Sequence, residues 1–162
     1  MIRRVRTEDL DVYRNIRLRA LAESPGAFGS TYAAESCRPP EAWVERVYRG
    51  ATSDEAATFL AYDGPDCVGL AGCVHDDLGA DFQLVSMWVE PAYRGQEVAS
   101  ELVAALLSWA TTRDARTVGL WVTRGNDRAQ RFYERIGFTV TGEVQPLPSD
   151  PCKNEMRMIR RL

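Results

Sequence analysis

Residues 89–99, VEPAYRGQEVA, join the end of one apolar run to the start of another. The run before them, residues 82–89, has the length and composition of a β-strand, and residues 98–112 have the apolar spacing of an amphipathic helix. The turn between them contains Arg94 and Gly95. Backbone N–H groups and the dipole at a helix N-terminus attract anions, an arginine adds positive charge, and a glycine lets an anion approach the backbone. The segment therefore predicts a strand, an anion-binding turn and a helix.

Residues 121–138, WVTRGNDRAQRFYERIGF, form a second strand-turn-helix segment about thirty residues further on. The strand is expected over residues 117–122. Asn126 is a suitable N-cap for the helix, and Gly137 is a typical residue just past its C-terminus. The apolar face of this helix consists of Ala129, Phe132, Tyr133 and Ile136.

Together the two segments resemble the fingerprints of the GNAT superfamily of acyl-CoA-dependent N-acyltransferases. The first family pattern is Val-x-Pro-x-x-Arg-Gly-x-Gly-x-Gly/Ala, and residues 89–99 depart from it only at Glu97. The second pattern is Asn-x-x-Ala-x-x-Phe/Tyr-Tyr-x-x-x-Gly-Phe, and every fixed position is filled between Asn126 and Phe138. Family members also carry stretches similar to residues 19–21, RAL, and 24–28, SPGAF.

The resemblance implies a mixed α/β sheet in which the parallel strands 82–89 and 117–122 splay apart to admit acetyl-CoA. Backbone groups of Met87 and Val89 would bind the pantetheine arm, and an N–H near Val89 would stabilise the oxyanion. No metal is implied. The residues expected at the cofactor are Met87, Trp88, Val89, Arg94, Gly95, Gln96, Glu97, Val98, Ala99, Ser100, Asn126, Ala129, Phe132 and Tyr133.

Glu97 stands where the family has its second glycine. If its side chain faces the pyrophosphate, repulsion would cost roughly 1–3 kcal/mol of binding free energy. If it faces solvent, that cost shrinks, because an acid in the first turn of a helix is locally favourable. A positive φ at this position would add strain.

The resemblance also assigns Tyr133 as the general acid that protonates the leaving thiolate. Many family members have a glutamate base on the strand before the pyrophosphate loop, but the acidic residue of this strand segment is Asp81, and Gln83 cannot accept a proton. Asp81 or Glu35, acting through water, are the candidate bases, and an amine that arrives partly deprotonated would need none.

Acceptor selectivity is expected from the first two helices and from the connection between Val144 and Asn154, because loops on a fixed scaffold usually carry specificity. Phe28, Tyr32 and Glu35 are the candidate substrate-binding residues, and Glu35 could pair with a cationic amine. The acceptor is expected to be a small-molecule or peptide amine.

Over its whole length the sequence predicts a single domain, residues 1–162, with the element order β-α-α-β-β-β-α-β-α-β-β. A strand over residues 2–6 precedes a helix capped by Thr7. Residues 27–38 are expected to form a loop or short helix, and a second helix opens at residues 39–40 and ends before Gly50. Three further strands, 57–62, 67–75 and 82–89, form an antiparallel meander, and 138–144 and 154–159 are the last two strands, linked by a connection that contains Pro146 and Pro148.

The composition excludes several other classes of protein. The net charge of −3 and the scattered basic residues argue against nucleic-acid and membrane binding, and mildly favour cationic acceptors. Four cysteines without a Cys-x-x-Cys pair and one histidine, His75, argue against a zinc site and against a histidine-based triad. With no apolar leader, a cytoplasmic location is expected.

Two alternatives stay open. The chain could be a non-catalytic acyl-CoA-binding module, or a structural subunit that has the fold without CoA. A homodimer is implied by the resemblance, and the C-terminal strand with Met156, Met158 and Ile159 is a candidate edge, although these residues also suit the core.

Overall fold

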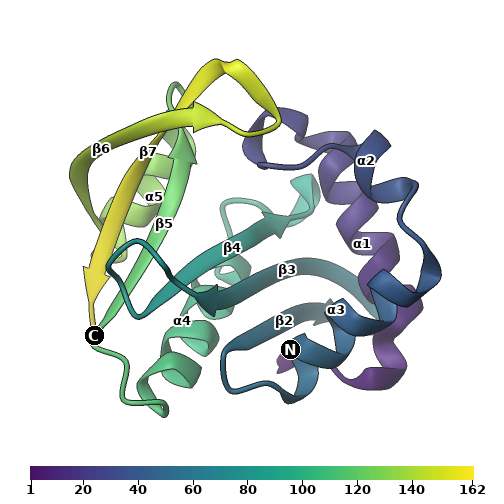
Figure 1. Ribbon diagram of the computed structural model, residues 1–162. Helices are drawn as coiled ribbons and strands as arrows, with labels where there is room; N and C mark the ends of the chain where they lie inside the picture. The colour runs from purple at the N-terminus through teal and green to yellow at the C-terminus, as the bar shows by residue number, and fades with distance from the viewer.

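The computed structural model describes residues 1–162 and is built on one seven-stranded mixed sheet. The strand order is β1-β2-β3-β4-β5-β7-β6, and all neighbours pair antiparallel except β4 and β5 (Figure 1). The predicted mixed α/β fold and the antiparallel meander are therefore confirmed. The strands are β1 (Ile2–Arg4), β2 (Ala56–Asp63), β3 (Asp66–His75), β4 (Phe82–Val89), β5 (Thr117–Thr123), β6 (Thr139–Leu147) and β7 (Asp150–Arg161).

Helices cover both faces of the sheet, and each face has its own apolar core. On one face α1 (Leu10–Glu23) and α3 (Pro40–Thr52) pack on β2 and β3, with α2 (Tyr32–Ser36) against α1. On the other face lie α4 (Val98–Thr111) and α5 (Asp127–Arg135). Short 3₁₀ turns, η1 (Thr7–Asp9), η2 (Pro25–Ala27) and η3 (Pro91–Tyr93), connect the larger elements. None of these helices is both long enough and apolar enough to cross a bilayer.

The parallel strands β4 and β5 pair only where they begin. Phe82 lies opposite Val118 and Gln83 opposite Gly119, and no later residue of either strand pairs with the other. On its other edge β4 remains paired with β3 up to Val89. The two strands consequently diverge towards their carboxyl ends and leave a gap in the middle of the sheet.

A bulge in β4 lies beside this gap. The β3–β4 register shifts between Leu70 and Gly72, and across from this shift Ser86 has a φ of 57°. A non-glycine residue rarely adopts this left-handed conformation, which costs about 1–3 kcal/mol. The Arg17 guanidinium donates a hydrogen bond to the Ser86 hydroxyl at 3.3 Å and so fixes the bulge to α1.

The β6–β7 hairpin differs from the expected strands joined by a long connection. β6 continues through Pro146 to Leu147 and β7 begins at Asp150, so most of the predicted Val144–Asn154 connection is paired strand. A proline is tolerated there because β6 is an edge strand. β7 is an interior strand between β5 and β6, so the candidate edge at β7 is wrong, and the fully buried Met158 belongs to the core, as the alternative interpretation had it.

Two helix boundaries also differ from the prediction. Gly50 lies inside α3, where a Cβ would come within 2.7 Å of the Thr58 hydroxyl oxygen, so this glycine allows the helix to pack closely on β2. Thr7 is not a cap. Instead the Asp9 carboxylate accepts the Arg6 backbone N–H at 2.7 Å and α1 begins at Leu10.

Candidate active site

A cavity of about 850 Å³ occupies the gap between β4 and β5. Its walls come from the end of β4, the start of α4 and most of α5, and on the opposite face of the sheet from the η2 segment. The lining residues are Ser24, Gly26, Ala27, Met87, Trp88, Val89, Arg94, Gly95, Gln96, Ala99, Ser100, Asn126, Arg128, Ala129, Arg131, Phe132, Tyr133, Arg135 and Ile136. The cavity therefore passes through the sheet and connects its two faces.

The loop before α4 presents unpaired backbone donors at one end of this cavity. The N–H groups of residues 95–100 have no acceptor in the protein, and of these residues Gly95, Gln96, Ala99 and Ser100 line the cavity. Gly95 has a φ of 81°, and a Cβ there would meet open space, so the conformation rather than crowding favours glycine. Unpaired donors at the N-terminus of a helix are suited to a phosphate group, and these residues fit the pyrophosphate of CoA.

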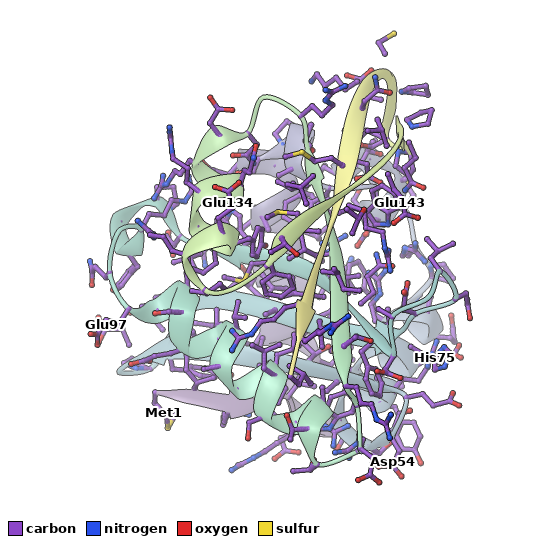
Figure 2. All side chains as sticks on the ribbon, turned by 90° about the vertical axis from the view of Figure 1, so that its left-hand side faces the viewer. Met1, Asp54, His75, Glu97, Glu134 and Glu143 are labelled. Carbon is purple, nitrogen blue, oxygen red and sulfur yellow. The ribbon has the colours of Figure 1, made fainter.

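Glu97 does not line the cavity. It has a φ of −72° and a ψ of −14°, ordinary helical values, and its side chain is exposed at the start of α4, pointing away from the body of the protein (Figure 2). The strain considered for a positive φ is therefore absent. Val98 likewise does not line the cavity, although it was expected at the cofactor.

Arg94 is held by an ion pair with α1. Its Nη1 and Nη2 lie 3.1 and 2.5 Å from the Glu23 carboxylate, and its Nε donates to the carbonyl of Val89 at 2.8 Å. Trp88 Nε1 donates to the same carboxylate at 2.9 Å. The hydrogen bonds from Arg94 are the main reason that the pKa of Glu23 falls to about 2. The positive charge expected from Arg94 is thus largely balanced by Glu23.

Free positive charge at the cavity comes instead from α5. Arg128, Arg131 and Arg135 are exposed, line the cavity and have no acidic partner within 4.0 Å. No acidic residue lines the cavity, although the whole chain has a net charge of −3. These arginines were not predicted from the sequence, although their three- and four-residue spacing places them on neighbouring positions of one helix face.

Tyr133 is buried in the cavity wall between two aromatic rings. Its ring centroid lies 5.2 Å from that of Phe132 and 5.7 Å from that of Phe138, both in edge-on orientations. The hydroxyl has no hydrogen-bond partner in the protein, and burial raises the pKa of the phenol above its usual value. The phenol is consequently protonated throughout the physiological range. Asn126, about two turns earlier, caps α5 by accepting the Ala129 N–H at 3.2 Å.

The site geometry agrees with the comparison of this chain with known protein families. The model of the Acetyltransferase (GNAT) family matches residues 20–138. The chain belongs to the GNAT family. An uncharacterized N-acetyltransferase of Mycobacterium tuberculosis is 33% identical over 111 residues, which cover 68% of this chain and 70% of that protein.

Solved GNAT structures share the fold at low sequence identity. An acetyltransferase of the GNAT family from Streptococcus pneumoniae aligns with a TM-score of 0.82 at 19% identity, covering 100% of this chain and 99% of that one. The PaiA N-acetyltransferase from Thermoplasma acidophilum, solved in complex with coenzyme A, aligns with a TM-score of 0.73 at 15% identity and covers 100% and 98%.

Neither carboxylate expected as the base of this GNAT protein lines the cavity. Asp81 lies at the beginning of β4, at the closed end of the gap, where one oxygen accepts the backbone N–H groups of Arg116 and Thr117 and the Thr117 hydroxyl. These hydrogen bonds lower the pKa of Asp81. Asp81 therefore joins the starts of β4 and β5 through hydrogen bonds. Its position and its bonding argue against a role as base.

Glu35 is completely buried in an ion-pair cluster of the helical layer. Its two oxygens accept hydrogen bonds from Arg17 at 3.1 and 2.7 Å and from Arg46 at 2.8 Å. Burial by itself would raise its pKa, but the two arginines outweigh that effect and hold the pKa at about 2. Glu35 therefore stays ionised and paired, which argues against both proposed roles, as a base and as a partner for a cationic amine.

The other expected acceptor residues are also outside the cavity. Phe28 is buried, with the Arg17 guanidinium 4.9 Å from its ring centroid, and Tyr32 is half exposed at the start of α2. The residues of this region that do line the cavity are Ser24, Gly26 and Ala27. No group of three or more histidine, cysteine, aspartate or glutamate side chains is placed to hold a metal ion.

A second cavity, of about 390 Å³, lies between α3 and the sheet and reaches Val85 and Ser86 on β4. Its charged lining residues are Arg38, Arg46 and Arg49 with Glu45. Because arginines outnumber acids in its lining, this cavity is not suited to a cationic ligand.

Proposed function

We propose that residues 1–162 form a single N-acetyltransferase domain that transfers the acetyl group of acetyl-CoA to a primary amine. The observation that carries the proposal is the cavity in the β4–β5 gap. It joins the unpaired N–H groups of Gly95, Gln96, Ala99 and Ser100 to a buried phenol, Tyr133, and its only charged lining residues are arginines. This is the arrangement that a long anionic thioester requires.

In the proposed reaction the pyrophosphate binds unpaired N–H groups among residues 95–100, and the arginines of α5 add electrostatic attraction. The pantetheine arm lies along the unpaired edge of β4. Because the Glu90 N–H donates to β3 at Val68, strand alternation turns the Val89 N–H towards the gap. We assign this N–H as the donor to the oxyanion that forms when the thioester carbonyl is attacked.

The amine attacks the thioester directly in a complex with both substrates. The new N–C bond forms as the C–S bond breaks, and the thiolate leaves with the bonding electrons. Tyr133 donates its proton to that thiolate. A thiolate of ordinary pKa about 8.5 is a weaker base than a phenolate, so the phenol must recover a proton promptly from the reacting nitrogen.

Two experiments test the proposal. Isothermal titration of acetyl-CoA should show one binding site, and release of CoA thiol should be measured with a panel of amines. Tyr133→Phe should lower kcat by about 10²–10⁴-fold with little change in acetyl-CoA affinity, because only the proton donor is removed. Tyr48→Phe is the matched control, since Tyr48 is exposed on α3.

A second candidate function is acyl-CoA binding without catalysis. It is favoured by the absence of Asp81 and Glu35, the two expected bases, from the cavity. Binding of acetyl-CoA without turnover of any amine would support it. Absence of binding would instead favour a structural subunit. The homodimer and the cytoplasmic location stay predictions.

A further inference from the structure

One buried carboxylate of this protein has no positively charged partner. Asp9 pairs with Arg3, Glu35 with Arg17 and Arg46, and Asp76 with Arg157, which is why these acids tolerate burial. Glu155 is also buried, with 8% of its surface exposed, but its only hydrogen-bond partner is the neutral amide of Gln145, which donates to it at 2.7 Å.

An unpaired buried acid is costly, so its presence suggests a function. Burial raises the pKa of Glu155, and the hydrogen bond from Gln145 opposes that shift only in part. A carboxylate of raised pKa is a better proton acceptor than an ordinary one, because the best catalytic base has a pKa near the working pH.

Glu155 does not itself line the acetyl-CoA cavity, but its neighbour on β5 is bonded to the cavity wall. Glu155 is directly opposite Thr123 in the β5–β7 ladder, so the two side chains share a face and their Cα atoms lie about 5 Å apart. The Thr123 hydroxyl donates to the carbonyl of Gly26 at 2.8 Å, and Gly26 lines the cavity. Thr123 thus connects Glu155 to the cavity wall at Gly26.

The shared face is the one from which an acceptor would approach. Met156 and Met158 point to the core beneath α4 and α5, so the alternate residues Glu155 and Arg157 point to the face that carries α1 and α2. There the hairpin turn is tied to the η2 region, because the Ser149 hydroxyl donates to the carbonyl of Phe28. Figure 1 shows this turn reaching across towards α1 and α2. CoA approaches from the α4–α5 face, which leaves this side for the amine.

We propose that Glu155 is the base that removes a proton from the acceptor ammonium group. The inference rests on the proposed acetyltransferase function. One N–H proton of the ammonium passes to the Glu155 carboxylate, and the freed lone pair forms the N–C bond while the C–S bond breaks. A second proton reaches the leaving sulfur by way of the Tyr133 phenol, which is restored, and Glu155 releases its own proton to water.

The charged groups around Glu155 leave this proton transfer unopposed. Along β7, Lys153 is exposed and pairs with Asp150, and Arg157 is bound to Asp76. From β6 the nearest charged group is Glu143, which is exposed and 3.7 Å from Arg157. The facing side chain on β5, Thr123, and the η2 residues are uncharged. No cation is therefore in place to fix Glu155 in its ionised form, as two arginines fix Glu35.

The test compares Glu155→Gln with wild type and with Glu143→Gln, a matched loss of one carboxylate on the neighbouring strand. Release of CoA thiol from acetyl-CoA is followed across the pH range with spermidine, an aminoglycoside and a peptide with N-terminal alanine. Acetyl-CoA affinity is measured by isothermal titration, and folding by circular dichroism. Glu155→Gln should lower kcat by about 100-fold or more at neutral pH, with acetyl-CoA affinity and folding unchanged.

The pH profile separates a base from a positioning role. In the wild type the rate should fall on the acid side as Glu155 becomes protonated. In Glu155→Gln the rate should no longer follow the titration of Glu155, and should instead rise with the fraction of amine that is unprotonated. Glu155→Asp, which retains a carboxylate, should recover part of the wild-type pH profile. Glu143→Gln should behave as wild type.

Three outcomes would overturn the inference. Turnover by wild type with an unchanged kcat and pH profile in Glu155→Gln would remove Glu155 as the base and leave the acetyltransferase function standing. A parallel loss of acetyl-CoA affinity and activity would make Glu155 structural. No turnover of any panel amine by wild type that binds acetyl-CoA would instead overturn the proposed function, and the inference with it.

Discussion

The helical layer and the β6–β7 hairpin each bury a glutamate, and the two sites differ in their partners. Glu35 is fully buried between α1, α2 and α3, with an arginine on each carboxylate oxygen. Glu155 is almost as buried, yet only the Gln145 amide reaches it. The pKa of Glu35 is held at about 2, whereas that of Glu155 is raised above its ordinary value.

Burial alone therefore does not tell which acid can take part in proton transfer. Desolvation acts on both groups in the same direction, and the presence or absence of a cation decides the outcome. Glu35 is a structural charge that stays ionised at any physiological pH. For Glu155, burial raises the pKa and no cation opposes the shift. The same distinction applies to the arginines, since Arg94 is paired with Glu23 while the arginines of α5 are free.

The largest expected effect is the loss of the paired charge in the helical layer. Glu35→Gln should lower the free energy of unfolding by about 3–5 kcal/mol, because it leaves Arg17 and Arg46 without their shared anion in a buried site. Urea denaturation measures this, with Glu41→Gln, an exposed acid of α3, as the control. If Glu35→Gln lowered the free energy of unfolding by less than about 1 kcal/mol, the ion pairs of Glu35 would contribute little to stability. Glu35 and Glu155 would then not differ in the way described above.

The ion pairs of Glu35 with Arg17 and Arg46 also predict that stability depends on pH. The pKa of Glu35 is lowered from 4.5 to about 2 in the folded state, so the unfolded chain binds more protons in that interval. The stabilisation is complete above pH 4.5 and is lost as the pH falls towards 2. Wild type and Glu35→Gln should therefore converge in stability over this window. A constant difference down to acid pH would contradict the ion-pair explanation.

The unpaired arginines of α5 should contribute to acetyl-CoA affinity. Replacing Arg131 by alanine should weaken binding by about fivefold, or about 1 kcal/mol, and the effect should diminish in high salt because the charges are exposed. Titration calorimetry at two salt concentrations measures both. Arg116→Ala, on an exposed residue outside the cavity, is the control. Equal losses in the two variants would mean that only net charge matters.

Glu155→Gln should change stability in the opposite sense to Glu35→Gln and by less. A raised folded-state pKa means that the folded protein binds more protons, so stability is lost as the pH rises through that pKa. Glu155→Gln cannot ionise at this position, so its stability does not fall as the pH rises through the pKa of Glu155. It should be slightly more stable than wild type at neutral and alkaline pH, and equal to it below the ordinary pKa of a glutamate. Thermal denaturation at several pH values measures the difference, and a less stable variant at neutral pH would show that the carboxylate has a missed partner.

The smallest expected effect is on acetyl-CoA affinity when Glu97, which departs from the GNAT pattern, is replaced by glycine. Glu97→Gly should change acetyl-CoA affinity by less than about threefold, because the Glu97 side chain is exposed and its backbone is helical. Glu101→Gln, one turn further along α4, controls for the loss of a charge. A much larger gain in affinity would mean that Glu97 turns towards the pyrophosphate when CoA binds.

The mixed fold, the meander and the ends of α5 could be predicted from the sequence because they depend on local signals. Apolar periodicity, the cap at Asn126 and the glycine at 137 act over a few residues. The hairpin and Gly50 could not be predicted in the same way. The pairing of β6 with β7 overrides the prolines that suggest a loop, and the packing of α3 on Thr58 explains a glycine that resembles a helix stop.

The GNAT fold, the anion-binding loop before α4 and the position of Tyr133 on α5 can all be predicted from the sequence alone. Each of these follows from a short, contiguous motif. The tertiary structure decided which charges are free and which are paired. Asp81, Glu35 and Arg94 are bound by groups distant in the chain, while Glu155 is left without a cation beside the cavity. Ion pairing depends on distances between side chains from separate elements, and those distances exist only once the sheet and its helical layers have assembled.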